Sequence, residues 1–186
     1  FYSSDSLSNS LNNCCEMMRV NYIDTLLLHG LSVSKELNKN NLDLLKKSKS
    51  KGIIKRIGIS IYNREEFSEI LNNYEIDVIQ MPLNILSRNC FPSNFFKMAK
   101  SRGIELQIRS IFMQGLLLMK KENRPIYFNK WDKLFDKWDK WILHEKISSI
   151  EACLSFAFKN KNIDKVIIGI DSYSQLNSIL KILDDL

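Results

Sequence analysis

The sequence predicts an α/β fold built on a parallel sheet, and three observations lead to this prediction. Short apolar runs alternate with amphipathic segments along the 186 residues, a rhythm typical of parallel strands joined by right-handed helical crossovers. The run at 22–29 is too short for a soluble helix and apolar enough to be buried on both faces. None of the six glycines is placed to form the G-x-G-x-x-G turn of a doubly wound dinucleotide-binding sheet.

These observations favour a (β/α) barrel over the doubly wound sheet that shares the same rhythm. A complete barrel needs eight strands and about 250 residues, whereas the sequence contains five recognisable strands. We therefore expect an incomplete (β/α)8 TIM-barrel-type fold in which residues 1–186 form a single partial domain. The chain begins with Phe1 and not with methionine, so it need not be a complete protein.

The first half of the chain alternates helical and strand patterns. The predicted elements are a helix at 6–19, a strand at 22–29, a helix at 38–50, a strand at 56–60, a helix at 64–72 and a strand at 77–81. The helix at 38–50 has a lysine-rich last turn, which suits its dipole, and stops at Gly52. The strand at 77–81 is closed by Pro82, because proline cannot donate to a strand ladder.

The second half continues the alternation with a longer insert before the last strand. The predicted elements are a helix at 92–102, a strand at 104–110, two insert helices near 131–142 and 147–160, a strand at 165–170 and a helix at 174–183. The first insert helix has an apolar stripe, which consists of Trp131, Leu134, Phe135, Trp138, Trp141 and Ile142. A basic aromatic helix can bind a membrane surface, but interleaved aspartates cancel most of its charge, so we expect core packing.

Composition excludes several classes of protein. No apolar run approaches the ~20 residues of a membrane span, and the Ser- and Asn-rich start is not a signal peptide, so we expect a cytoplasmic protein without a membrane partner. The net charge is +6, but the lysines are interleaved with acidic residues, which favours a solvated surface over a nucleic-acid site. The spacing of the four cysteines indicates neither a disulfide framework nor a zinc site.

Polar residues follow the predicted strands at their carboxyl ends, where parallel α/β folds bind ligands. They are His29, Ser60, Gln80 with Asn84, Arg109 with Ser110, and Gly169 with Asp171 and Ser172. Hydrogen-bonding groups around one histidine suit a carbonyl substrate and an amide-bearing cofactor better than a metal ion, for which carboxylates and further histidines are missing. His29 is the first candidate for chemistry, although a histidine at a strand end can also serve packing.

Five segments, in order, resemble the aldo/keto reductase family. They are 21–29, 51–60, 77–84, 108–117 and 166–176, which together extend over nearly the whole chain. The resemblance implies a (β/α)8 barrel that binds NADP(H), or NAD(H), across its mouth and transfers hydride to an aldehyde or ketone.

The resemblance also implies roles for individual residues. His29 would hydrogen-bond the substrate carbonyl oxygen as charge builds on it. Ser60 and Gln80 match positions that hold the nicotinamide amide, and Arg109 and Ser110 match contacts to the nicotinamide ring and the pyrophosphate. The backbone at Gln114, Gly115 and Leu116 resembles the pyrophosphate loop. The segment beside the adenosine phosphate would be 169–175, which includes Gly169, Asp171, Ser172 and Gln175.

The sequence departs from the family in three respects. The family's catalytic tyrosine, lysine and aspartate lie on strands that would precede Phe1, so the chain would supply strands four to eight, and we expect it to be inactive and poorly folded by itself. Ile61 stands where the family often has asparagine. Asp171 and Ser172 stand where many members have a basic residue for the 2′-phosphate, so we expect a weakened preference for NADP over NAD.

Two other functions remain open from the sequence. The chain could belong to a non-catalytic barrel subunit that binds a nucleotide cofactor or a partner protein. It could also belong to a different barrel enzyme that acts on a phosphorylated substrate. Such an enzyme would have a glycine-rich phosphate loop after its last two strands, and the sequence offers only Gly169 there. The sequence indicates neither the carbonyl substrate nor the oligomeric state.

Overall fold

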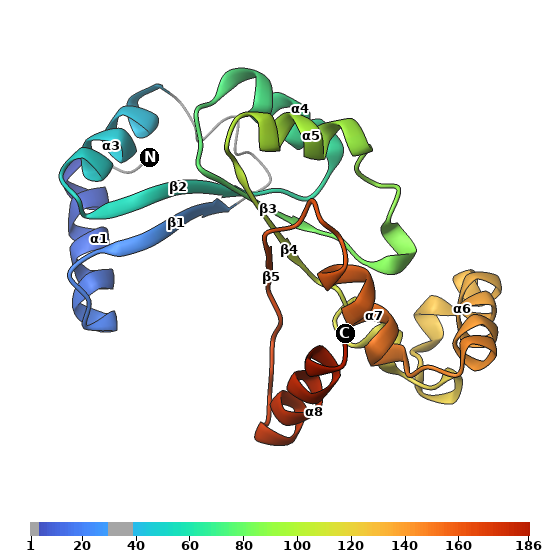
Figure 1. Ribbon diagram of the computed structural model, residues 1–186. Coiled ribbons are helices and arrows are strands. Elements are labelled where there is room, and N and C mark those ends of the chain that lie inside the picture. The colour runs from blue at the N-terminus through green and yellow to red at the C-terminus, as the bar shows by residue number, and fades with distance from the viewer. Residues whose placement is uncertain (1–3, 30–38) are drawn as a thin grey trace. The chain divides into compact units, whose positions relative to one another are not determined.

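The computed structural model describes residues 4–29 and 39–186. The helices are α1 (Ser4–Met18), α3 (Lys39–Ser50), α4 (Arg64–Asn73), α5 (Ser93–Ser101), α6 (Asp132–Glu145), α7 (Ser149–Phe158) and α8 (Tyr173–Asp184), as shown in Figure 1. The strands are β1 (Ile23–His29), β2 (Ile54–Ser60), β3 (Val78–Pro82), β4 (Glu105–Arg109) and β5 (Lys165–Val166). Short 3₁₀ helices occupy Ile85–Ser87, Leu116–Leu118, Lys121–Asn123 and Ile126–Trp131.

The strands form one sheet in the order β1-β2-β3-β4-β5. Pairing is parallel between β1 and β2 and between β2 and β3. Strand order therefore follows chain order, as it does when each strand is joined to its neighbour by a crossover. The predicted α/β alternation is confirmed, and most predicted element boundaries lie within a few residues of the observed ones.

The chain forms two compact units, one of residues up to 81 with 90–107 and the other of 82–89 with 108–186. In the first unit, β2, β3, the start of β4 and the helices α4 and α5 contribute side chains to the core, among them Ile57, Ile59, Phe67, Ile70, Leu71, Val78, Ile79, Phe96 and Leu106. In the second unit, the core cluster joins α6, α7 and the segment before them, and consists of Leu116, Leu117, Phe135, Trp138, Ala152 and Cys153. Burial raises the pKa of the Cys153 thiol to about 12.

The two outer strands differ from the sequence prediction. The side chains of Leu26, Leu27 and Leu28 in β1 are only partly buried, because β1 is the first strand of the sheet and pairs only with β2 among the described residues. The predicted strand at 165–170 is reduced to Lys165–Val166. The amide of Ile167 still donates to Ile108 O at 2.7 Å, but Ser110 has a left-handed φ of 61°, so the partner strand ends there.

Local sequence signals account for the helix ends. Asn63 caps α4 by accepting a hydrogen bond from the Glu66 amide. Ser148 and Glu151 form a reciprocal capping box at the start of α7, and the Ser148 side-chain and backbone hydrogen bonds hold the pKa of Glu151 below its usual value. No helix within 4–29 or 39–186 is long and apolar enough to cross a bilayer.

The apolar stripe of α6 is only partly buried, so the expectation of core packing is correct for part of it. Phe135 and Trp138 are buried in the core of the second unit. In contrast, Trp131, Leu134 and Trp141 are exposed by 41%, 43% and 39%. The described residues of the second unit therefore cover only part of the stripe.

Gly58 allows the first three strands to approach closely. It pairs in register with Leu27 of β1 and Val78 of β3. A Cβ atom at Gly58 would lie 2.6 Å from Leu27 Cδ2 and 2.8 Å from Val78 Cβ, both too short for a normal contact. The absence of a side chain at this position is therefore a packing requirement of the sheet.

We expect Gly58→Ala to destabilise the protein by about 1–3 kcal/mol, because the added methyl group overpacks a buried strand. Urea denaturation of the full-length protein measures this change in the free energy of unfolding. Gly169→Ala is the matched control, since no atom lies within 4 Å of its added Cβ. Equal stability of the Gly58→Ala variant and the wild type would contradict the packing role.

Candidate functional site

The parallel register aligns three of the predicted residues at the carboxyl ends of neighbouring strands. His29 of β1 pairs with Ser60 of β2, and Ser60 pairs with Gln80 of β3. The His29 side chain is exposed at the end of its strand, whereas Ser60 is 1% exposed. The structure therefore brings these three residues of the first unit into adjacent positions, as the strand-end pattern predicted.

His29 has a tyrosine partner that the sequence prediction missed. Tyr62 Oη lies 2.8 Å from His29 Nε2, within hydrogen-bond distance. The two rings meet edge to face, with centroids 5.5 Å apart. Tyr62 comes two residues after the end of β2, and His29 is paired with that end. This position in the register is the signal that could have identified Tyr62 from the sequence.

The Ser60 and Gln80 side chains begin a chain of hydrogen bonds across the sheet. Ser60 Oγ donates to Gln80 Oε1 at 3.4 Å, and Gln80 Nε2 donates to Gln107 Oε1 at 3.3 Å. Gln107 Nε2 then donates to Glu105 Oε1 at 2.7 Å. These bonds hold both predicted amide-binding side chains in fixed orientations, because each is tied to a neighbouring strand.

The network ends at an arginine between two carboxylates. Arg56 Nη1 donates to Glu105 Oε2 at 2.7 Å, and Arg56 Nη2 also bonds Asp24. Hydrogen bonds to Asp24 and Glu105 raise the pKa of Arg56 above its usual value. The charge at this end of the network is balanced by acidic partners and is not presented to a ligand.

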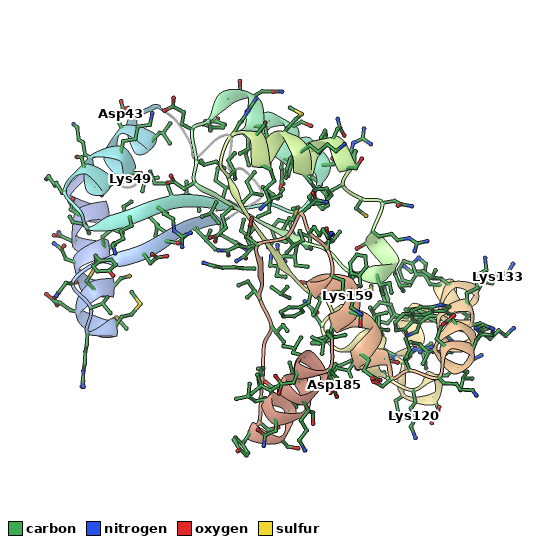
Figure 2. The ribbon with its side chains drawn as sticks, viewed as in Figure 1. Asp43, Lys49, Lys120, Lys133, Lys159 and Asp185 are labelled. Carbon is green, nitrogen blue, oxygen red and sulfur yellow. The ribbon has the colours of Figure 1, made fainter. Side chains whose placement is uncertain are left out.

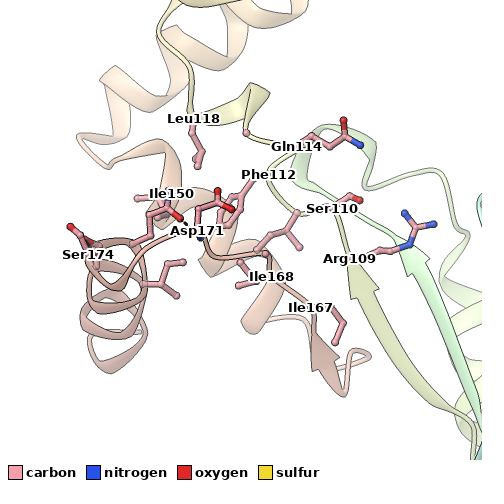
Figure 3. Close-up of a pocket in the computed structure, with 16 residues that line it drawn as sticks. Arg109, Ser110, Phe112, Gln114, Leu118, Ile150, Ile167, Ile168, Asp171 and Ser174 are labelled. Atoms are coloured by element: carbon pink, nitrogen blue, oxygen red, sulfur yellow. Dashed lines mark hydrogen bonds between the residues drawn. The ribbon is translucent and has the colours of Figure 1, made fainter. Parts of the chain in front are cut away.

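The second unit contains a cavity of about 810 Å³ that most of the remaining predicted residues line (Figure 3). The predicted residues in its wall are Arg109, Ser110, Gln114, Gly115, Gly169, Asp171 and Gln175. Its apolar wall includes Phe112, Ile150, Ile167, Ile168 and Ile179. Residues that follow β4 and residues that follow β5 thus line the same cavity, because these two strands are neighbours in the sheet.

The loop that follows β4 has an unusual backbone. Ser110, Met113 and Gln114 have φ angles of 61°, 49° and 55°, and Gly115 follows at 88°. Left-handed conformations are costly for residues other than glycine. Hydrogen bonds hold this loop closed, since Met113 N donates to Ser110 O and both Gly115 N and Leu117 N donate to Phe112 O.

Three predicted residues, Ser172, Gln175 and Leu116, act structurally as well. Ser172 Oγ caps α8 by accepting from the Gln175 amide at 3.2 Å, and Gln175 Oε1 accepts from the Asp171 amide at 2.9 Å. The Leu116 side chain is buried in the core of the second unit, and its amide donates to Met113 O. Neither Leu116 nor Ser172 belongs to the wall of the cavity.

The cavity suits a nucleotide in part. Arg109, Ser110 and Ser174 are polar residues of its wall, and the isoleucines supply apolar surface for a base. Figure 3 shows the Arg109 side chain pointing away from Phe112 and Asp171. A Cβ at Gly115 or Gly169 would meet no atom within 4 Å, so this side of the cavity is open. The Asp171 carboxylate in the same wall disfavours an additional phosphate.

Comparisons with known proteins agree with this geometry. Residues 2–185 match the defining sequence pattern of the aldo/keto reductase family. The NADH-specific methylglyoxal reductase of Escherichia coli K12 is 27% identical over 117 residues, a match that covers 62% of this chain and 36% of that protein.

Solved structures share the fold. The aldo-keto reductase AKR11C1 from Bacillus halodurans, in its holo form, is 19% identical with a TM-score of 0.77, and the match covers 99% of this chain and 63% of that one. The thermostable aldo-keto reductase Tm1743, in complex with the inhibitor epalrestat, is 17% identical with a TM-score of 0.70, over 98% of this chain and 62% of that one. The chain thus spans less than two thirds of the length of these relatives and, through the pattern that matches residues 2–185, belongs to the aldo/keto reductase family.

Proposed function

We propose that this chain forms strands four to eight of a (β/α)8 barrel in an NAD(P)H-dependent oxidoreductase that reduces an aldehyde or ketone. Family membership and the alignment of His29, Ser60 and Gln80 at three strand ends support this proposal. The match to 63% of the Bacillus halodurans structure is consistent with a partial barrel. Three further strands would pair with the outer strands β1 and β5.

In this proposal His29 hydrogen-bonds the carbonyl oxygen as negative charge develops on it. In the tautomer that carries the imidazole proton on Nε2, this nitrogen donates to Tyr62 Oη in the structure described here. A substrate oxygen would take the place of the tyrosine oxygen as acceptor. Tyr62 would therefore orient the ring before the substrate arrives.

Each of the two groups of predicted residues has its own proposed role toward the cofactor. Ser60 and Gln80 would hold the nicotinamide amide. The cavity of the second unit would hold the adenosine diphosphate portion against Arg109 and Ser110. When bound, a reduced nicotinamide supplies hydride to the carbonyl carbon, while the carbonyl oxygen takes up a proton.

Asp171 supports a preference for NADH within this proposal. Its carboxylate is in the cavity wall beside the start of α8, where a 2′-phosphate would add negative charge. The Escherichia coli relative is named as NADH-specific, which agrees with this choice. A weakened preference for NADPH follows from like-charge repulsion.

We expect His29→Leu to lower kcat/KM for methylglyoxal reduction by about 10²-fold, the usual cost of removing a hydrogen-bond donor to a developing oxyanion. The measurement is the oxidation of NADH or NADPH by the full-length protein, followed by absorbance. His144→Leu is the matched control, because His144 is the only other histidine in the 186-residue sequence.

Full activity in the His29→Leu variant would remove this residue from the mechanism. The 186 residues expressed as an isolated chain provide a second comparison, for which we expect neither turnover nor a cooperative unfolding transition. Carbonyl reduction by that chain together with sharp unfolding would contradict the proposal that it is part of a larger barrel.

We expect Tyr62→Phe to shift the ¹⁵N resonance of His29 Nε2, because the variant lacks the hydroxyl that lies 2.8 Å from this nitrogen. Nitrogen-detected NMR of the imidazole side chains in the full-length protein measures the change. The resonances of His144 should stay in place and serve as the internal control. Unchanged His29 resonances would show that the hydrogen bond is absent in solution.

We expect Asp171→Arg to tighten NADPH binding about tenfold relative to NADH, which corresponds to about 1.4 kcal/mol. The physical reason is the replacement of a repelled carboxylate by a cation that can pair with the 2′-phosphate. Fluorescence titration of each cofactor with the full-length protein measures both dissociation constants. Asp185→Arg, at the other end of α8, is the control for net charge, and an equal change in both variants would argue against a local effect.

A further inference from the structure

The acidic side chains of α6 that form ion pairs lie on a different side of the helix from its exposed lysines. Asp136 pairs with Lys121 at 2.8 Å, and Asp139 accepts from Arg124 Nη1 at 2.8 Å. The hydrogen bond from Lys121 lowers the pKa of Asp136. Two of the helix aspartates, Asp136 and Asp139, are therefore occupied by cations of the preceding segment.

The lysines on another side of the helix keep their charge exposed. Lys133 and Lys137 are one turn apart, and neither side chain makes an ion pair or hydrogen bond with another residue of 4–29 or 39–186. Figure 2 shows Lys133 extending away from α6. This side of α6 is consequently cationic, although the helix as a whole carries aspartates too.

A shallow groove of about 500 Å³ lies beside these lysines, between α6 and residues 85–89 of the same unit. Its lining consists of Ile85, Leu86, Arg88, Asn89, Leu134, Lys137, Trp138 and Trp141. Trp138 forms a fixed part of the groove, because it is buried and its indole N–H donates to Leu117 O at 3.3 Å. The lining contains two cations and no carboxylate among the described residues.

The exposed apolar side chains in the groove are those that the sequence placed in the core. Leu134 and Trp141 are both exposed, and the Trp141 ring centroid lies 5.6 Å from that of Trp138. Aromatic residues and arginine are enriched at protein interfaces. An apolar surface beside unpaired cations is complementary to an acidic ligand that also carries an apolar group.

Missing strands of the proposed barrel do not account for this groove. Its two walls follow β3 and β4, which have neighbours on both sides in the sheet order. Added strands would pair at β1 and β5, the outer strands of the order. Strands added to this sheet would therefore leave the groove uncovered.

We infer that this groove binds an acidic segment of a partner protein, with an apolar side chain against Leu134 and Trp141 and carboxylates paired with Arg88 and Lys137. The concave shape favours a peptide over a membrane surface, which is flat on this scale. The groove is too open for the nearly complete burial that small-molecule sites provide.

The test uses a fluorescein-labelled peptide in which glutamates alternate with leucine and phenylalanine, titrated with the full-length protein and followed by anisotropy. We expect binding that weakens at least about tenfold in the double variant Arg88→Glu with Lys137→Glu. Trp141→Ser should weaken binding by a similar factor through the loss of apolar contact. Circular dichroism of each variant checks that the fold is retained.

Lys159→Glu with Lys161→Glu is the matched control, because it makes the same change in net charge at exposed positions outside the groove. Unchanged binding in this control, with loss in the groove variants, supports the inference. Equal weakening in both double variants would indicate general attraction to a basic protein and overturn it. Absence of peptide binding, or tighter binding to phosphatidylserine vesicles than to the peptide, would overturn it as well.

Discussion

The register between β1, β2 and β3 is the constraint on which the candidate site depends. Pairing of His29 with Ser60 and of Ser60 with Gln80 puts three polar side chains at adjacent strand ends. A slip of one residue would turn each side chain to the opposite face of the sheet. Gly58 helps to fix this register, since only a residue without a Cβ fits between Leu27 and Val78.

In the second unit, ion pairs fix the orientation of helix α6. Arg124 and Lys121 come from the segment before α6 and bind the aspartates of that helix. Arg124 also lies over the Phe135 ring, 4.8 Å from its centroid. Ion pairs and packing thus fix which side of α6 faces the core, and this orientation leaves the Trp141 side uncovered.

Hydrophobic periodicity was sufficient to predict the order and type of the elements, because burial against a sheet imposes that periodicity on each segment. It was not sufficient to predict the burial of side chains on the first strand of the sheet and on the uncovered side of α6. The leucines of β1, Trp131 just before α6, and Leu134 and Trp141 within α6 are apolar, yet their exposure depends on whether a neighbour exists. Tyr62 was missed for a related reason, since its approach to His29 depends on pairing between two strands.

The closed loop after β4 restricts the sequence changes that this part of the chain can accept. Ser110, Met113 and Gln114 adopt conformations that glycine accepts most readily, and the carbonyl of Phe112 receives two amide protons to keep them there. Insertions or deletions would break these bonds, and β-branched replacements would strain the backbone further. Substitutions that keep the loop length constant should therefore be tolerated better than insertions or deletions. Glycine, asparagine and aspartate should be the most readily accepted replacements at the left-handed positions.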